Sequence, residues 1–287
     1  MEAFCFHRYI KLALNFAFVY ILVFFTSFLR AGGLAGVYAA QGWKYGIMYI
    51  FIDMLGLSSY VPTPSLNETW WYMQVAILFV FLVPVFIKIY KAIGRTIVVF
   101  VAFLGFSSFV IPWDLSGAAF LLYLFCVVIG IWCAEENIFE RCHHISFCKF
   151  KQMNHLIKIV ISVFLFAFFV YLRIKVTTFN YWIDAIIPIP VCIFCMELSG
   201  LIPFSEKIMG FIGKHSMNMF LIHTIIFEYY FTEFIYSPKY WVLVLLLLSG
   251  TSLLGSVAIE SLKKALCYPK VINFFILCIE KGKMNRC

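Results

Sequence analysis

Apolar residues run through this chain in long stretches, and short polar segments separate them. Eight stretches approach the roughly 20 predominantly apolar residues that a helix needs to cross a lipid bilayer. They cover residues 12–28, 70–90, 96–113, 117–133, 156–172, 181–201, 216–234 and 241–259. The pattern predicts an all-α fold, a polytopic bundle of about eight transmembrane helices joined by short loops.

A ninth apolar stretch, residues 45–57, is shorter and carries Asp53. Its length favours a re-entrant or interfacial helix over a further crossing. We expect residues 1–287 to form a single membrane-embedded domain, since no segment has the composition of a separate soluble domain.

Composition supports this class and excludes others. Of the 287 residues, 64% are hydrophobic and only 13% are charged, whereas charged residues make up about 25% of soluble domains. Disordered chains need low hydrophobicity and high charge, so disorder is excluded as well. Several of the ten cysteines lie in apolar runs, where a free thiol packs as a small hydrophobe, and no disulfide framework is expected.

The net charge of +8 indicates an orientation rather than a nucleic-acid partner. With a cytoplasmic N-terminus and eight crossings, 17 of the 22 basic residues fall on the cytoplasmic side. Cytoplasmic loops of membrane proteins carry such an excess. The sequence therefore predicts an integral, multi-pass membrane protein with both termini in the cytoplasm, in contact with the lipid bilayer and not with nucleic acid.

The segment with most polar residues inside an apolar region is residues 213–223. Ser216 is expected at a helix N-cap, after Gly213. Ser216 and His223 are seven residues apart and share one helix face, with Asn218 between them. Polar groups inside a bilayer are costly and mark functional sites by default, but they also form hydrogen bonds between helices. Ser216, Asn218 and His223 are thus predicted either to line a core cavity or to join helices.

Two further groups lie at the predicted membrane surfaces. Arg8 and Lys11 are neighbours on one helix face at the cytoplasmic side, and they suit either a phosphate-bearing ligand or an ordinary basic flank. Glu68, Trp70 and Trp71 lie at the external start of the second predicted span. Their aromatic rings suit an interfacial belt or the face of a sugar.

A third cluster, Cys142, His143, His144, Cys148 and His155, has residue types that bind metals. Its spacing matches no standard zinc pattern. The sequence predicts no metal site and no bound cofactor.

Taken together, several of these pieces resemble the acyltransferase 3 family of integral membrane O-acyltransferases. Residues 213–223 resemble its late-helix signature, and Arg8-x-x-Lys11 resembles its basic Arg-x-x-Arg motif. Residues 68–72 with Pro84, and residues 259–264, also fit its pattern. The resemblance implies transfer of an acyl group, usually acetyl, from cytoplasmic acyl-CoA as co-substrate to a hydroxyl of a cell-surface polysaccharide or lipid-linked glycan. It implies that Arg8 and Lys11 lie near the phosphates of the donor.

One departure from the family changes the expectation for catalysis. The family begins with two further helices, the first of which carries an Arg and a His that is the presumed general base. The resemblance implies that this chain lacks those helices, and that it is truncated, completed by another chain or inactive. We expect residues 1–287 to transfer no acyl group on their own. His223 is the one histidine inside a predicted span and is the remaining candidate base.

Two other functions fit the same polar groups. A transporter or flippase for a polar lipid or glycan would use them without covalent chemistry. A non-catalytic remnant would use them neither for transport nor for catalysis. Consumption of acyl-CoA distinguishes an acyltransferase from both.

Overall fold

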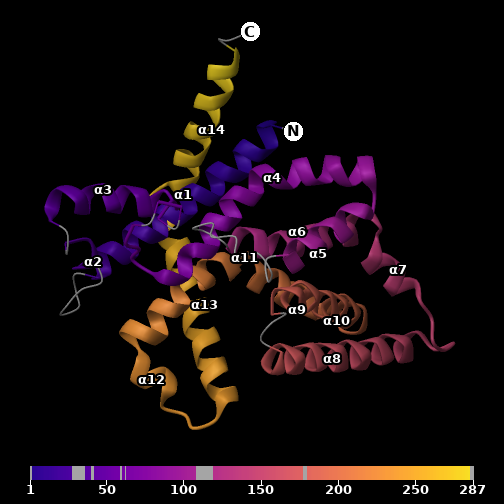
Figure 1. The fold of residues 1–287 in the computed structure, drawn as a ribbon. Helices are drawn as coiled ribbons and strands as arrows, with labels where there is room; N and C mark the ends of the chain where they lie inside the picture. Colours follow the sequence, from indigo (N-terminus) through magenta and orange to yellow (C-terminus); the bar gives the residue numbers. More distant parts are fainter. Residues whose placement is uncertain are drawn as a thin grey trace. The chain divides into compact units, whose positions relative to one another are not determined.

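The computed structural model describes residues 2–27, 36–39, 42–58, 60–61, 63–107, 119–176 and 180–284. Every regular element in these ranges is a helix, so the predicted all-α class is confirmed (Figure 1). Five described helices are long and apolar enough to cross a membrane, namely Cys5–Ser27, Glu68–Ile93, Lys151–Lys175, Trp182–Leu201 and Trp241–Ala265.

The predicted number of about eight spans is not confirmed. Two of the missing spans coincide with α5 (Thr96–Ser107) and α6 (Ala119–Glu135), which have 12 and 17 residues. The end of the first prediction, residues 108–113, and the start of the second, residues 117–118, lie outside the described residues. The third coincides with the second half of α11 (Pro203–Ile225), where polar side chains lower the hydropathy.

The predicted N-cap at Ser216 is wrong, because α11 begins at Pro203 and runs through Gly213 without a break. Proline suits the first position of a helix, and a single glycine in a helix costs only about 1 kcal/mol. After α11 the chain forms one π-helical turn, η2 (Ile226–Tyr230), and the short helix α12 (Thr232–Tyr236).

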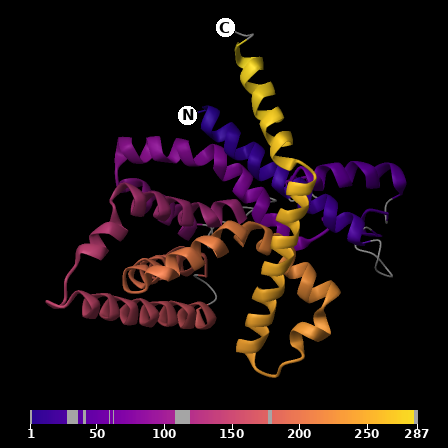
Figure 2. The ribbon, with the colours of Figure 1, turned by 180° about the vertical axis from the view of Figure 1, so that it is seen from behind.

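Contacts divide the chain into two compact units, Met1–Phe81 with Phe211–Cys287, and Leu82–Gly210. The first unit contains α1 (Glu2–Ser27), α3 (Trp43–Met54), η1 (Glu68–Trp70), α13 (Trp241–Ala265) and α14 (Tyr268–Met284), together with α2 (Gly36–Ala39), the start of α4 (Trp71–Ile93) and the second half of α11. In it, α13 packs against η2 and α12 and is followed by α14 at the C-terminal end (Figure 2).

The core of the first unit is aromatic. Phe16, Tyr20 and Trp70 are each at most 1% exposed, and Leu221 of α11 packs in the same cluster. The Trp70 ring lies 5.3 Å from the Phe16 ring and 5.7 Å from the Tyr20 ring, measured between centroids. The first pair is edge-to-face and the second is tilted, and such aromatic pairs add to the burial of apolar area, so η1 is fixed against α1 and α11.

A buried carboxylate organises the chain between α3 and α4. Asp53 is fully buried at the end of α3. One of its oxygens accepts hydrogen bonds from the hydroxyls of Ser58 and Ser65, at 2.7 and 2.9 Å. The other accepts from the Leu66 backbone N–H at 2.7 Å and from the Tyr38 hydroxyl. The predicted short helix around Asp53 is therefore present as α3, and its depth in the bilayer stays a prediction.

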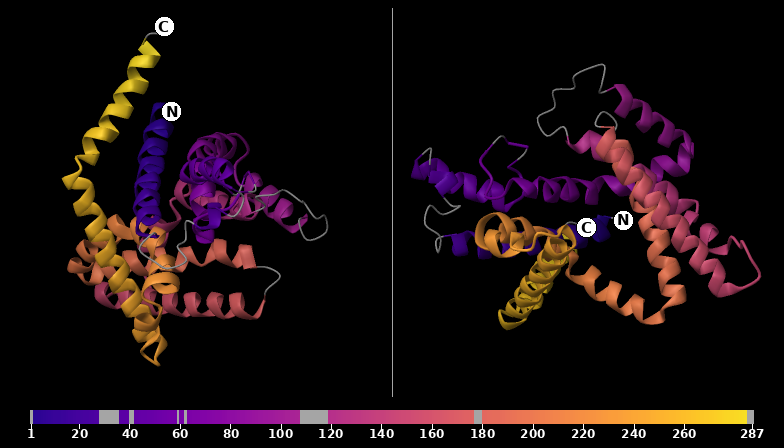
Figure 3. Two further views of the ribbon diagram at one scale, coloured as in Figure 1. Left: turned by 90° about the vertical axis from the view of Figure 1, so that its left-hand side faces the viewer. Right: turned by 90° about the horizontal axis from the view of Figure 1, so that it is seen from below.

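The second unit is built on α8 (Lys151–Lys175) and α10 (Pro188–Leu201), which lie side by side (Figure 3). Helix α6 packs against α5 and α9 (Asn180–Ile186), and α7 (Ile138–His144) packs against α10. The buried residues of α8 are His155, Lys158 and Ser162. This spacing places one polar stripe of α8 on one helix face.

An ion pair outside the candidate spans joins the α4–α5 turn to the residue after α6. The Arg95 guanidinium donates to both carboxylate oxygens of Glu136, at 3.1 and 2.8 Å. These hydrogen bonds hold the pKa of Glu136 below its ordinary value. Paired hydrogen bonds of this kind give a defined geometry, although the pair is exposed to solvent.

Candidate functional site

A pocket of about 690 Å³ opens in the first unit between α1, α11, α13 and α14. Its lining consists of His7, Arg8, Lys11, Leu12, Asn15, Lys214, Met217, Asn218, Glu260, Lys263, Tyr268 and Ile272. The structure thus brings Arg8 and Lys11, predicted to bind a donor, to the same pocket as Asn218, predicted to line a cavity. Arg8 and Lys11 lie near the start of the sequence, and Asn218 follows Lys11 by 207 positions.

The rim of the pocket is positively charged. Arg8 and Lys11 are exposed one turn apart on α1, and Lys214 is exposed on α11. Within the described residues, Lys11 and Lys214 have no acidic partner. Among the described residues that line the pocket, Glu260 is the only acid. An anion entering the pocket therefore meets an excess of positive charge.

The floor of the pocket is a closed network of four side chains from α1, α11 and α13. The Lys263 ammonium donates to Glu260 Oε1 at 2.7 Å and to the Asn15 side-chain oxygen. The Asn218 amide donates to the same Glu260 oxygen at 2.7 Å and accepts from Asn15 Nδ2 at 3.1 Å. Each polar group thus has a partner, as a buried charge requires.

Sequence reasoning missed Asn15, Lys214 and Lys263 as parts of this site. Lys263 is only 4% exposed, and its ammonium also lies 5.4 Å from the centre of the Tyr268 ring. The available signal was a Glu260-x-x-Lys263 pair in an otherwise apolar stretch, since charges inside a membrane segment mark functional sites. The i, i+3 spacing puts the two on one face.

Ser216 does not share the pocket. It is exposed, and its hydroxyl donates to the Gly213 carbonyl oxygen at 2.8 Å within α11. Of the three residues predicted to line one cavity, Asn218 lines this pocket, and Ser216 and His223 do not.

A second polar group lies farther along α11, where η1 docks. The Thr69 and Thr224 hydroxyl oxygens are 3.2 Å apart, and the Trp70 indole N–H donates to the Leu221 carbonyl at 2.9 Å. The predicted contact of Trp70 with a sugar at the external mouth is wrong, because its side chain is fully buried in the core. Glu68 is exposed and Trp71 is half-buried.

His223 belongs to this second group. Its Nδ1 lies 2.6 Å from the Phe220 carbonyl oxygen. A carbonyl only accepts hydrogen bonds, so this contact places a proton on Nδ1. Nε2 lies 3.3 Å from the Thr224 hydroxyl oxygen. With the proton on Nδ1, Nε2 is the nitrogen through which the neutral form of the half-buried ring accepts a hydrogen bond.

The expectation that His223 alone lies inside a span is wrong. His155 falls within the candidate span Lys151–Lys175, and α11 is not one of the five candidate spans. His215 is also buried, with Nδ1 2.8 Å from the Ser256 hydroxyl.

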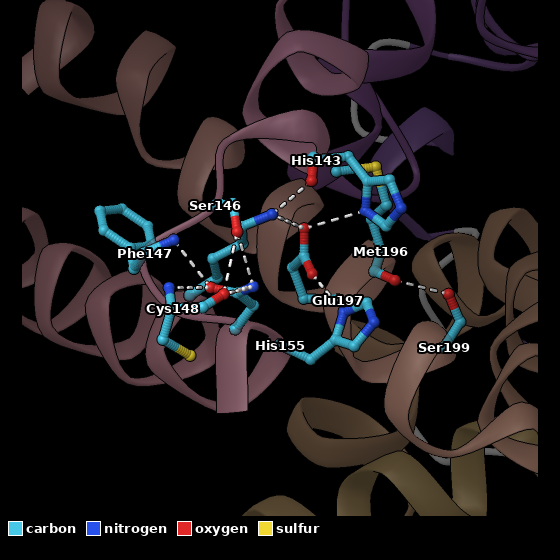
Figure 4. Close-up of polar contacts among 10 residues, drawn as sticks. His143, Ser146, Phe147, Cys148, His155, Met196, Glu197 and Ser199 are labelled. Carbon is cyan, nitrogen blue, oxygen red and sulfur yellow. Dashed lines mark hydrogen bonds and ion pairs between the residues drawn. The ribbon is translucent and has the colours of Figure 1, made fainter. Parts of the chain in front are cut away.

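Three side chains of metal-binding type meet in the second unit. Atoms of His143, His155 and Glu197 that can bind an ion all lie within 4.8 Å of one another (Figure 4). The sequence spacing of the Cys142–His155 segment predicts no metal site, and that prediction did not include Glu197.

Comparison with known proteins identifies the family. Residues 1–261 match the sequence model of the acyltransferase 3 family, described as an acyltransferase domain. No curated protein and no solved structure matches the chain. The match covers nearly the whole chain and includes the described residues of both groups up to Glu260, whereas Lys263, Tyr268 and Ile272 of the pocket follow it. The chain therefore belongs to this family of membrane acyltransferases.

Proposed function

We propose that the protein is a membrane O-acyltransferase that uses acyl-CoA, with acetyl as the acyl group and a cell-surface polysaccharide or lipid-linked glycan as the acceptor. The supporting observation is the basic pocket in the first unit, which combines exposed cations with a polar floor. In the reaction the acceptor hydroxyl forms an ester with the acyl carbon. The carbon–sulfur bond breaks, and the hydroxyl proton ends on the CoA thiol.

The basic rim suits the donor because CoA carries a diphosphate and a further phosphate on its ribose. Arg8, Lys11 and Lys214 supply three exposed cations around one opening. Hydrogen bonds to ionised groups contribute about 1.5–3 kcal/mol each, and less where water screens them. A pocket of about 690 Å³ is also in the size range of small-molecule sites, about 300–1,000 Å³.

The second polar group of α11 suits the acceptor. Thr224 follows Asn218 by six residues, which places the two about 9 Å apart along the helix axis. In the neutral form of His223 with its proton on Nδ1, Nε2 would accept a hydrogen bond from a sugar hydroxyl. Glu68 and Trp71 remain the candidates for contact with the rest of the sugar, whereas Trp70 supports them from the core.

The location in the cell follows from the donor in this proposal. Acyl-CoA is made in the cytoplasm, so the basic pocket, which contains the start of α1, would face the cytoplasm of the cell membrane. The charge distribution favours the same orientation, with both termini inside. The charge count assumes eight crossings, and that number is not confirmed, so the orientation stays a prediction.

Binding of the donor tests the proposal. Purified residues 1–287 in lipid nanodiscs would be titrated with labelled acetyl-CoA. We expect saturable binding that unlabelled CoA abolishes and pantetheine, which lacks the phosphates, does not. Absence of saturable binding, or equal competition by pantetheine, would reject the basic pocket as a donor site.

A separate prediction concerns His223. His223→Ala removes one hydrogen bond to the acceptor, worth about 1 kcal/mol, so we expect about fivefold weaker binding of an acceptor glycan and unchanged affinity for CoA. Ser216→Ala, on the exposed face of the same helix, is the matched control and should leave both affinities unchanged. An equal loss of CoA affinity in His223→Ala would contradict the separation of the two groups.

A further inference from the structure

A charged cluster in the second unit has no part in the proposed acyl transfer. Glu197 of α10 is fully buried. His143 Nδ1 lies 3.1 Å from Glu197 Oε1, and His155 Nδ1 lies 2.6 Å from Oε2 (Figure 4). Lys158 completes the cluster, with Nζ 3.3 Å from Glu197 Oε1 and a hydrogen bond to the His143 carbonyl. The cluster joins α7, α8 and α10.

The packing around His155 holds the cluster in place. His155 and Lys158 are one turn apart on α8 and are 6% and 7% exposed. Gly200 of α10 lies directly against the His155 ring, because a Cβ at that position would come within 2.7 Å of ring carbon Cε1. Any larger residue at position 200 would displace the imidazole. The close approach of the two helices therefore fixes the ring that faces Glu197.

The cluster holds more potential ligands than an ion pair needs. His155 contacts the carboxylate through Nδ1, while its Nε2 is buried without a hydrogen-bond partner among the described residues. Nδ1 is therefore the ring nitrogen of His155 that serves the cluster. Lys158 alone would neutralise the Glu197 carboxylate, yet two imidazoles contact it as well. Two imidazoles and a carboxylate around one point are a ligand set typical of zinc sites with an open fourth position.

We propose that His143, His155 and Glu197 form a binding site for a divalent transition metal, and that Zn²⁺ is the ion that the site binds. The two imidazole nitrogens and one carboxylate oxygen are its ligands. Zinc bonds of about 2.0–2.2 Å place ligand atoms roughly 3.3 Å apart, so the 2.6 Å contact between His155 and Glu197 must open by less than 1 Å. Each imidazole that binds the metal through Nδ1 releases the proton from that nitrogen.

Lys158 has a defined part in this proposal. A buried carboxylate without a neighbouring cation is costly, and Lys158 supplies that cation when the metal is absent. When zinc binds, the Lys158 ammonium gives up its contact with Glu197 and keeps the His143 carbonyl. Lys158 therefore competes with the metal for Glu197. A variant without the lysine distinguishes a metal site, which should bind the ion more tightly, from an ion-pair network that binds no metal.

Zinc binding to the purified full chain tests the proposal. The protein in nanodiscs would be freed of metal with a chelator and titrated with Zn²⁺ against a chromophoric indicator. We expect one equivalent to bind, and His155→Ala or Glu197→Gln to weaken binding about 100-fold or more, since loss of outer-sphere partners alone costs about 10–100-fold. Lys158→Met should bind zinc more tightly than the wild type. His144→Ala, an exposed neighbour of His143, is the matched control and should bind normally.

Cobalt gives an independent readout. Co²⁺ in this site should show the visible absorption of a tetrahedral nitrogen and oxygen environment, without the near-ultraviolet band of a cobalt–thiolate bond. The proposal is overturned if Lys158→Met binds zinc no more tightly than the wild type. It is equally overturned if the wild type binds no more zinc than Glu197→Gln, or if a thiolate band disappears in Cys142→Ser. Where His155→Ala does not fold, His143→Gln replaces it, and elution as a single species verifies each variant.

Discussion

Replacing both Arg8 and Lys11 by alanine is expected to weaken CoA binding about 100-fold. Both side chains are exposed on one face of α1 and line the pocket. A charge-assisted hydrogen bond to phosphate contributes about 1.5 kcal/mol or more, and each 1.4 kcal/mol is about tenfold in affinity. The single variants should each lose about tenfold. The measurement is equilibrium binding of labelled CoA to the purified chain at low and high salt, with a smaller loss expected at high salt.

The chain offers a matched control for this double variant. Lys88 and Lys91 are also exposed, three residues apart, on the last turns of a candidate span. They represent the ordinary basic flank of a membrane helix. Lys88→Ala with Lys91→Ala should leave CoA affinity unchanged. If both double variants lose affinity equally, Arg8 and Lys11 act only through general surface charge.

Replacing Asp53 by alanine is expected to destabilise the first unit by about 4 kcal/mol or more. Asp53 accepts hydrogen bonds from the side chains of Tyr38, Ser58 and Ser65 and from the Leu66 backbone. Without the carboxylate these buried donors lose their acceptor, and each unsatisfied group costs about 1–3 kcal/mol. Thermal unfolding of the purified protein in detergent measures the effect.

Asp184 provides the comparison for Asp53. Its carboxylate accepts from Arg173 Nε at 2.7 Å, but the two side chains are 28% and 40% exposed. Exposed ion pairs contribute about 0–1 kcal/mol, so Asp184→Ala should change the unfolding temperature little. Similar losses for the two variants would show that Asp53 is not the organising group of the chain between α3 and α4.

The helical class and the basic pair at positions 8 and 11 were predictable from local spacing. Long apolar stretches define helices in a membrane protein, and residues three apart on a helix are neighbours. Asn218 was also predictable, as a polar residue in an apolar run. Patterns of this kind are local to one helix, so they predict the features that a single helix determines.

The remaining features depend on contacts between distant segments. Asn15 meets Asn218 across 203 positions, and Lys263 meets Asn15 across 248. Trp70 has the sequence context of an interfacial tryptophan, yet packing against Phe16 and Tyr20 buries it completely. No periodicity within one helix indicates which partner a side chain will meet.

The number of spans also shows that local patterns do not determine the contacts between segments. Residues 216–234 are apolar enough to suggest a crossing, but they are divided among α11, a π-helical turn and α12. Glu197 likewise lies in an apolar stretch without a nearby partner in sequence, and its contacts come from α7 and α8. Tertiary contacts, rather than composition, give these residues their surroundings.

The most direct test of the account is to map where CoA binds. The purified chain would be irradiated with a photoreactive CoA analogue, digested, and analysed by mass spectrometry. The account predicts labelled peptides from the pocket-lining parts of α1, α11, α13 and α14, and loss of that labelling when excess CoA, but not pantetheine, is added. Labelling confined to the second unit, or labelling of the pocket that CoA does not reduce, would contradict the assignment of the basic pocket as the donor site.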